Sequence, residues 1–153
     1  MDSKISLSLR NRRELLIPEQ FEEWCQRNVP GYPSGGGLLR FDGLYRDQDE
    51  KDNGNDYLRF YPDGTVLDVA VRAPSTAEQV AQWLGKNKRG ISRGKYKRRG
   101  TQIAFTTRSG RVAISYVGMV VNDHTIALEF YSHATTSQGL TWYSYEQGAN
   151  LVP

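Results

Sequence analysis

The chain has 153 residues, a mass of 17.4 kDa and a formal net charge of +3 at neutral pH. A single domain of this size would bury about 68–70% of its unfolded surface, so we expect one core and no second independent one. With 38% hydrophobic and 11% aromatic residues, the composition excludes a disordered chain. No stretch reaches the ~18 apolar residues of a membrane span, and the N-terminus lacks the apolar segment of a signal peptide.

No metal or cofactor site is indicated by the sequence. Cys25 is the single cysteine, which excludes an internal disulfide, and neither His124 nor His133 makes a metal-binding spacing with it. The acidic segment 47–56 does not match a calcium-binding loop in any register. We therefore expect a cytoplasmic protein that uses no cofactor and no metal.

Residues 1–37 form a predicted N-terminal extension with one helix that packs on the main domain. Pro18 is placed to open this helix, and Ile17, Phe21, Trp24 and Cys25 recur at helical spacing. Prolines and glycines between positions 30 and 37 end it and lead into the main domain, residues 38–153.

A second, short helix is predicted near position 80. Ser75 and Glu78 form a capping box, and Gly85 ends the segment. The apolar positions between them lie at i, i+3, i+4 and i+7, so one face of this helix needs an apolar surface to cover.

Eight segments rich in β-branched and aromatic residues are predicted as strands: 38–46, 57–61, 65–72, 91–98, 101–107, 112–121, 125–132 and 140–145. The connections are short, apart from the crossover that carries the second helix, so neighbouring strands pair antiparallel. Leu67, Val69 and Val71 alternate with polar positions and predict an apolar inner face. The fold class is therefore mainly β, an eight-stranded antiparallel up-and-down barrel; a two-sheet sandwich is the alternative.

Three motifs support a barrel: Phe-Asp-Gly-Leu-Tyr-Arg at 41–46, Tyr-Leu-Arg-Phe-Tyr-Pro-Asp-Gly-Thr-Val at 57–66 and Gly-Lys-Tyr at 94–96. Their order resembles lipocalin-like (calycin) barrels, and is similar to the C-terminal region of an F-box-only ubiquitin-ligase subunit. The resemblance spans residues 38–146. No F-box precedes this region in the sequence, so the adaptor role in ubiquitin ligation is not implied. Unlike lipocalins, the chain has Tyr45 where their first strand has Trp, and no basic residue follows Arg111.

For function, the resemblance implies several classes. Calycin barrels serve as carriers of small molecules, as interaction modules and, less often, as isomerases or lyases. We expect noncatalytic binding of a small, partly apolar ligand inside the barrel, anionic ligands included. The predicted ligand-binding residues are Arg59, Tyr96, Tyr116 and Tyr143.

The direction of Arg59 depends on the turn at 62–64. If Asp63 and Gly64 make a two-residue turn, Arg59 faces Asp68 and forms an exposed ion pair. If the turn has three residues, Arg59 faces Leu67 and points into the barrel, where a ligand carboxylate is its natural partner. The sequence leaves both registers open.

No catalytic constellation is apparent. His124 and His133 would project from opposite faces of one strand, and no pair of carboxylates is expected inside the strands. Glu129 stands alone between apolar residues and is predicted to be exposed. Trp24, Trp83 and Trp142 are interpreted as packing or rim residues.

The charge is unevenly distributed. Residues 79–122 contain ten Lys or Arg and no acid, so the remainder has ten bases against seventeen acids, a net charge of −7. Such a basic stretch is typical of a solvated strand face, but it also suits a polyanion. The alternative function is therefore an interaction module with a packed interior, which binds an acidic protein or a nucleic acid through the stretch 86–99: Lys88, Arg89, Arg93, Lys95, Lys97 and Arg98. The sequence does not predict an oligomeric state.

Overall fold

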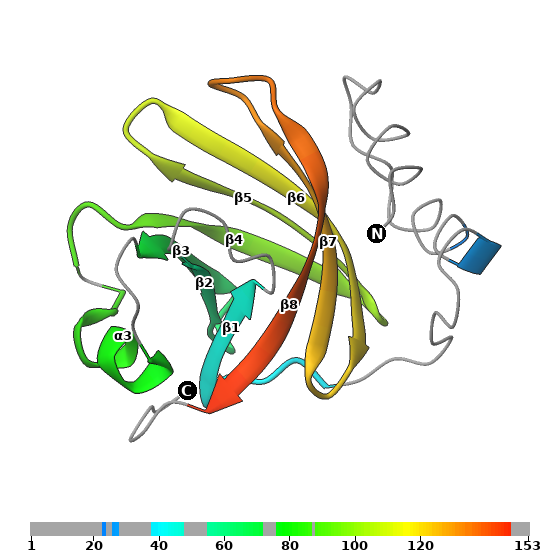
Figure 1. The fold of residues 1–153 in the computed structure, drawn as a ribbon, viewed down its shortest axis with the longest axis horizontal. Coiled ribbons are helices and arrows are strands. Elements are labelled where there is room, and N and C mark those ends of the chain that lie inside the picture. Colours follow the sequence, from blue (N-terminus) through cyan, green and yellow to red (C-terminus); the bar gives the residue numbers. More distant parts are fainter. Residues whose placement is uncertain are drawn as a thin grey trace.

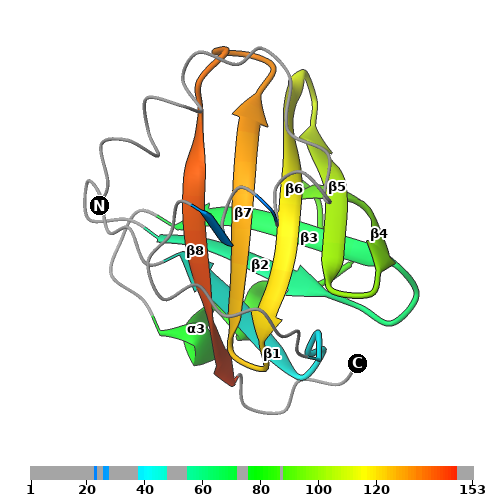
Figure 2. The ribbon, with the colours of Figure 1, turned by 90° about the vertical axis from the view of Figure 1, so that its right-hand side faces the viewer.

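The computed structural model describes Glu23, Gln26, Arg27 and residues 38–47, 55–71, 76–86 and 88–147. In these residues eight antiparallel strands close into one barrel in chain order (Figure 1). The strands are β1 (Gly43–Asp47), β2 (Asn55–Phe60), β3 (Thr65–Val71), β4 (Ser92–Arg99), β5 (Gln102–Ser109), β6 (Val112–Asn122), β7 (Thr125–Ser132) and β8 (Gln138–Gln147). Figure 2 shows β5 to β8 side by side in front, with β2 and β3 crossing behind them.

Closure depends on the pairing of the first strand with the last. Gly43 lies opposite Gln147, and Asp47 lies opposite Tyr143. The eight predicted strands and the up-and-down order are thus confirmed, and the sandwich alternative is wrong. The predicted N-terminal helix falls outside the described residues, apart from three single positions. None of the described helical segments has the length and hydrophobicity of a membrane span.

A short helix, α3 (Ala77–Trp83), joins β3 to β4. Thr76 is its N-cap, and its side chain accepts a hydrogen bond from the Gln79 backbone N–H while the Gln79 side chain accepts one from the Thr76 N–H. A capping box therefore exists near the predicted position, but Thr76 and Gln79 form it, so the predicted pair of Ser75 and Glu78 is wrong.

The main core lies inside the barrel and draws on every strand. Its buried members include Tyr45, Phe60, Phe105 and Tyr116, with Tyr96 packed against them. Phe60 makes edge-to-face contacts with Tyr45, Tyr96 and Phe105, at centroid distances of 5.3–5.6 Å. Aromatic rings therefore occupy the half of the interior near the β2–β3 turn.

A second apolar cluster lies outside the barrel, between α3 and the outer faces of β1 to β3. It includes Leu67 and, from the helix, Val80 and Leu84. Leu67, Val69 and Val71 were predicted to face the interior, and this is wrong, because they belong to this outer cluster. Val66 and Leu67 are both fully buried, which shows that β3 is covered on both faces.

Both Gly-x-Tyr motifs have a structural reason. A Cβ atom on Gly94 would lie 1.9 Å from the Thr106 carbonyl oxygen, and one on Gly43 would lie 2.5 Å from the Glu146 carbonyl oxygen. Only glycine permits these close strand approaches. Two residues later, Tyr45 and Tyr96 pack into the interior.

Candidate functional site inside the barrel

Polar side chains converge inside the barrel next to the aromatic half. Asp68 Oδ2 accepts hydrogen bonds from the Tyr116 hydroxyl at 2.6 Å and the Thr107 hydroxyl at 3.0 Å. Asp56 Oδ2 accepts one from the Tyr143 hydroxyl at 2.8 Å. We call these five residues the carboxyl cluster. They come from β2, β3, β5, β6 and β8, so barrel closure assembles them.

Strand register explains why the two carboxyl groups meet. Asp68 lies opposite Leu58, and Asp56 lies opposite Ala70, so the two acids are diagonal neighbours on adjacent strands. Asp56 shares its face of β2 with Leu58 and Phe60, both members of the interior core. Both carboxyl groups therefore point inward.

Burial and proximity alter the acid–base properties of the carboxyl cluster. Burial raises the pKa of Asp56 well above its ordinary value, and the charge of Asp68 and a hydrogen bond to it act in the same direction. The pKa values of Tyr116 and Tyr143 are also raised well above normal, chiefly by burial and then by the neighbouring carboxylates. The two tyrosines therefore stay protonated and act as donors.

Chemically, the carboxyl cluster can hold a proton between two carboxyl groups and can accept hydrogen bonds from a guest molecule. Carboxyl pairs of this kind are suited to acid–base work or to binding a cationic or hydrogen-bond-donating group. The expectation that no paired carboxylates lie inside the strands is wrong, because Asp56 and Asp68 both occupy the interior.

Three of the four predicted ligand-binding residues lie inside the barrel. Tyr116 and Tyr143 belong to the carboxyl cluster, and the Tyr116 ring also stacks on Phe105 at 4.7 Å. Tyr96 lies in the aromatic half, where its hydroxyl donates to the Tyr61 carbonyl at 2.5 Å. The carboxyl cluster thus brings together two of the predicted tyrosines and leaves the third apart.

Arg59 lies on the opposite side of the barrel wall. It pairs with Leu67 across the strands, as the three-residue turn predicts, but that face is the outer one, beneath α3. Its guanidinium donates to the Leu84 carbonyl at 3.4 Å and lies 4.5 Å from the centre of the Tyr61 ring. The inward orientation of Arg59 is therefore wrong, because α3 buries the outer face of β2 and β3, and burial alone does not distinguish this face from the interior.

Glu129 and the two histidines are not members of the carboxyl cluster. Glu129 was predicted to be exposed, but it is fully buried. His124 and His133 lie in turns outside β7, and His133 shares a hydrogen bond of 2.8 Å with the Ser115 hydroxyl. Within the described ranges, no group of three or more His, Cys, Asp or Glu residues could hold a metal ion.

The predicted polyanion-binding residues lie on and beside β4. The six side chains are all exposed: Lys88, Arg89, Arg93, Lys95, Lys97 and Arg98. Arg93, Lys95 and Lys97 point outward from β4, away from the carboxyl cluster. Arg98 lies on the same side of β4 as Gly94 and Tyr96, opposite Ile103 of the interior core, at the exposed end of the strand.

Sequence reasoning missed Asp56, Asp68 and Thr107. Asp68 was assigned to the outer face because its neighbours Leu67 and Val69 are apolar. The signal that could have corrected this is the predicted helix near position 80, whose apolar face needs an apolar surface such as this side of β3.

Fold and site together define a small closed antiparallel β-barrel whose interior carries two neighbouring carboxyl groups, those of Asp56 and Asp68. Comparison with protein-family models, curated proteins and solved structures yields no match.

Proposed function

We propose that the barrel binds a small, partly apolar molecule whose polar end carries a hydrogen-bond donor or a positive charge. The observation that carries this proposal is the convergence of Asp56 and Asp68 inside the barrel, beside an aromatic wall. Buried carboxyl groups destabilise a fold unless they are paired, and strongly perturbed groups concentrate at functional sites. A guest amine would supply a positive charge, which the five described members of the carboxyl cluster lack.

This ligand differs from the anionic one that the sequence suggested. The described polar groups of the carboxyl cluster are carboxyls and hydroxyls, and Arg59 lies outside the wall. A ligand carboxylate would meet like charge there, whereas an amine or alcohol would meet acceptors. The role we propose is binding without catalysis, in a barrel of the calycin type; the up-and-down strand order supports that kinship.

The test compares ligands that differ only in their polar end. Isothermal calorimetry and native mass spectrometry would use matched aryl-alkyl amines, alcohols and carboxylic acids. We expect one-to-one binding of an amine or alcohol and much weaker binding of the acid with the same carbon skeleton. If the acid binds best, or no member of the panel binds, the proposal is wrong.

A matched pair of variants localises the site. Tyr143→Phe removes a hydroxyl from the carboxyl cluster, while Tyr131→Phe removes one from the outer wall, beside His133. Tyr143→Phe should change the affinity for the amine by about fivefold or more, and Tyr131→Phe should leave it unchanged. Equal effects of the two substitutions would place the ligand elsewhere.

A further inference from the structure

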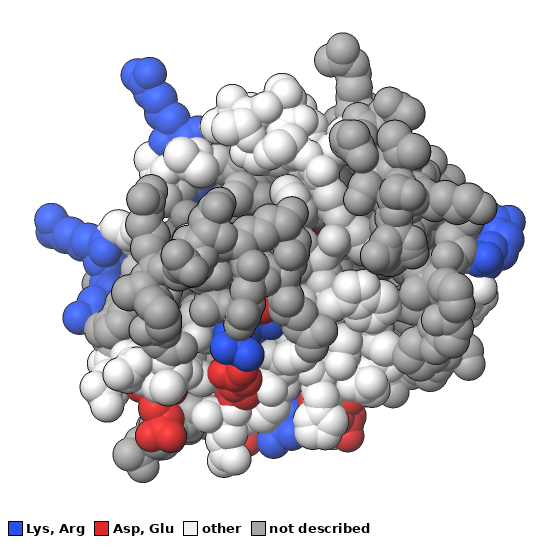
Figure 3. All heavy atoms as spheres, in the orientation of Figure 1, with Lys and Arg blue, Asp and Glu red and all other residues white. Residues whose placement is uncertain are grey.

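We propose that the outer face of β4 and β5 binds the phosphate backbone of a single-stranded nucleic acid. Along β4 the exposed side chains of Arg93, Lys95 and Lys97 alternate with Gly94 and Tyr96, which face the interior. One side of this strand is therefore a straight row of cations. Lys and Arg side chains project in Figure 3 on the side where Figure 1 places the start of β4 and the β5–β6 hairpin.

The charge of this face is not balanced by acids of its own segment. Residues 79–122 contain ten Lys or Arg and no Asp or Glu. On β5, Arg108 lies directly opposite Arg93, and Arg111 follows in the next turn. Like charges directly opposite each other destabilise a sheet, and a bound anion would relieve this repulsion.

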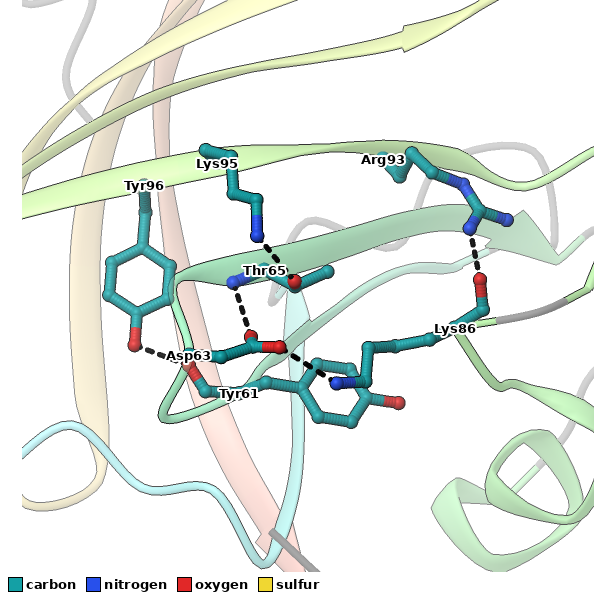
Figure 4. A network of polar contacts seen from close by, with 7 residues as sticks. All are labelled: Tyr61, Asp63, Thr65, Lys86, Arg93, Lys95 and Tyr96. Atoms are coloured by element: carbon teal, nitrogen blue, oxygen red, sulfur yellow. Dashed lines mark hydrogen bonds and ion pairs between the residues drawn. The ribbon is translucent and has the colours of Figure 1, made fainter.

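Hydrogen bonds position Arg93 and Lys95 at the surface, near the β2–β3 turn (Figure 4). Lys86 forms an ion pair of 2.8 Å with Asp63, so its charge is neutralised within the fold. Arg93 donates to the backbone carbonyls of Lys86 and Lys88, and Lys95 Nζ donates to Thr65 Oγ1 at 3.1 Å. Arg93 and Lys95 thus bond neutral oxygen atoms, which position the side chains without neutralising their charge.

Regular spacing favours a phosphate backbone over an acidic peptide. Alternate residues of a strand are about 6.6–6.8 Å apart, so the row repeats its charge at a constant interval. A nucleic acid strand carries one negative charge on every nucleotide, whatever its sequence, whereas an extended acidic peptide presents evenly spaced charges on one side only where acids stand at alternate positions. The evenly spaced phosphates of a nucleic acid strand therefore match the row of Arg93, Lys95 and Lys97 best.

The surface beside the row allows close approach. Lys95 lies opposite Thr106 and Lys97 lies opposite Ala104, both small residues. The Thr106 and Ser115 hydroxyls are hydrogen-bonded to each other at 2.9 Å, and Ser115 is also bonded to His133, so the surface beside the row is polar as well as low. The outward positions of β4 and β5 carry no aromatic side chain that could stack on a base, so we infer binding through the backbone, without sequence preference.

The test measures fluorescence anisotropy of a labelled oligothymidylate of roughly 15 nucleotides across a salt series. We expect binding that weakens steeply with salt. The double variant Lys95→Gln/Lys97→Gln should lower the affinity about tenfold and reduce the slope of log affinity against log salt by about 1.4. The control Asn122→Asp/Gln147→Glu makes the same change in net charge at exposed sites outside β4 and β5, and should change the affinity far less.

Three results would overturn the inference. The wild-type protein could fail to bind the oligonucleotide at low salt, or the double variant and the control could lose affinity equally. Polyglutamate at the same charge concentration could also displace the oligonucleotide, which would assign the face to an acidic protein. Thermal melting of each variant verifies that loss of binding does not reflect loss of the fold.

Discussion

Asp56 places one carboxyl group inside the barrel beside that of Asp68. Because burial and the charge of Asp68 raise the pKa of Asp56 well above its ordinary value, the folded state favours the protonated form. A group whose pKa is raised on folding stabilises the fold at low pH, and this contribution is lost as the pH rises through the folded-state pKa. Asp56 should therefore make the barrel less stable at alkaline pH than at acidic pH. Asp68, Tyr143, Asp47 and Tyr116 are the titratable groups that face it.

Asp56→Asn removes this titration and keeps an acceptor oxygen for the Tyr143 hydroxyl. The free energy of unfolding of the variant should exceed that of the wild type by about 1 kcal/mol or more near pH 8, and the difference should shrink near pH 4. Urea denaturation at both pH values measures it. Asp63→Asn is the control for a carboxyl group with the opposite shift. The hydrogen bond from Lys86 lowers the pKa of the Asp63 carboxyl, so removing this carboxylate should destabilise the fold at neutral pH. An Asp56→Asn difference that is independent of pH would contradict the prediction.

Sequence reasoning at the residue level failed where both faces of a strand are buried. Alternation of apolar and polar residues predicts an inner face only if the other face meets solvent. In β3, Val66 belongs to the interior core and α3 covers Leu67, so the alternation does not show which face points into the barrel. The sequence left two registers open for the turn at 62–64. The three-residue alternative gives the observed pairing of Arg59 with Leu67, but this pair lies on the outer face of the barrel and not inside it. The carboxyl cluster was missed for the same reason, because Asp68 was assigned to the outside.

At the scale of elements, β4 and β5 carry a repulsive pair that costs stability. Arg108→Glu would place an acid opposite Arg93 and replace repulsion with attraction. We expect the free energy of unfolding to rise by about 0.5 kcal/mol at low salt, and the gain to fade at high salt. The same substitution should weaken oligothymidylate binding, so stability and binding change in opposite directions. Arg111→Glu makes the same charge change in the adjacent turn and should stabilise less; if it stabilises equally, the effect is one of net charge.

Strand order and helix position were the parts of the fold that sequence could predict. Short connections such as Arg99 to Gln102 permit only antiparallel neighbours, and eight such strands can remove both sheet edges by closing. Helix α3 was predicted because its cap and its apolar spacing are local features. The site could not be predicted in this way, because its residues come from five strands and meet only after closure.

At the scale of the whole molecule, the pairing of β1 with β8 joins the first strand to the last and closes the barrel wall. Gly43 stands in this seam, where an added methyl group would lie 2.5 Å from the Glu146 carbonyl oxygen and 2.6 Å from the Tyr145 ring. Gly43→Ala should therefore destabilise the fold by about 1–3 kcal/mol, because one of the two strands must move. Since the seam joins every strand into one wall, the loss should appear as a shift of a single cooperative transition.

Gly85→Ala provides the comparison for this seam. Among the described residues, and apart from its chain neighbours, no heavy atom lies within 4 Å of a Cβ at Gly85, so the same chemical change there should leave the midpoint nearly unaltered. Chemical denaturation followed by both tryptophan fluorescence and far-ultraviolet circular dichroism measures the midpoints and the number of transitions. Equal midpoint shifts in the two variants would show that the close approach at Gly43 does not govern stability. Two separate transitions in Gly43→Ala would show that the barrel wall does not unfold as one unit.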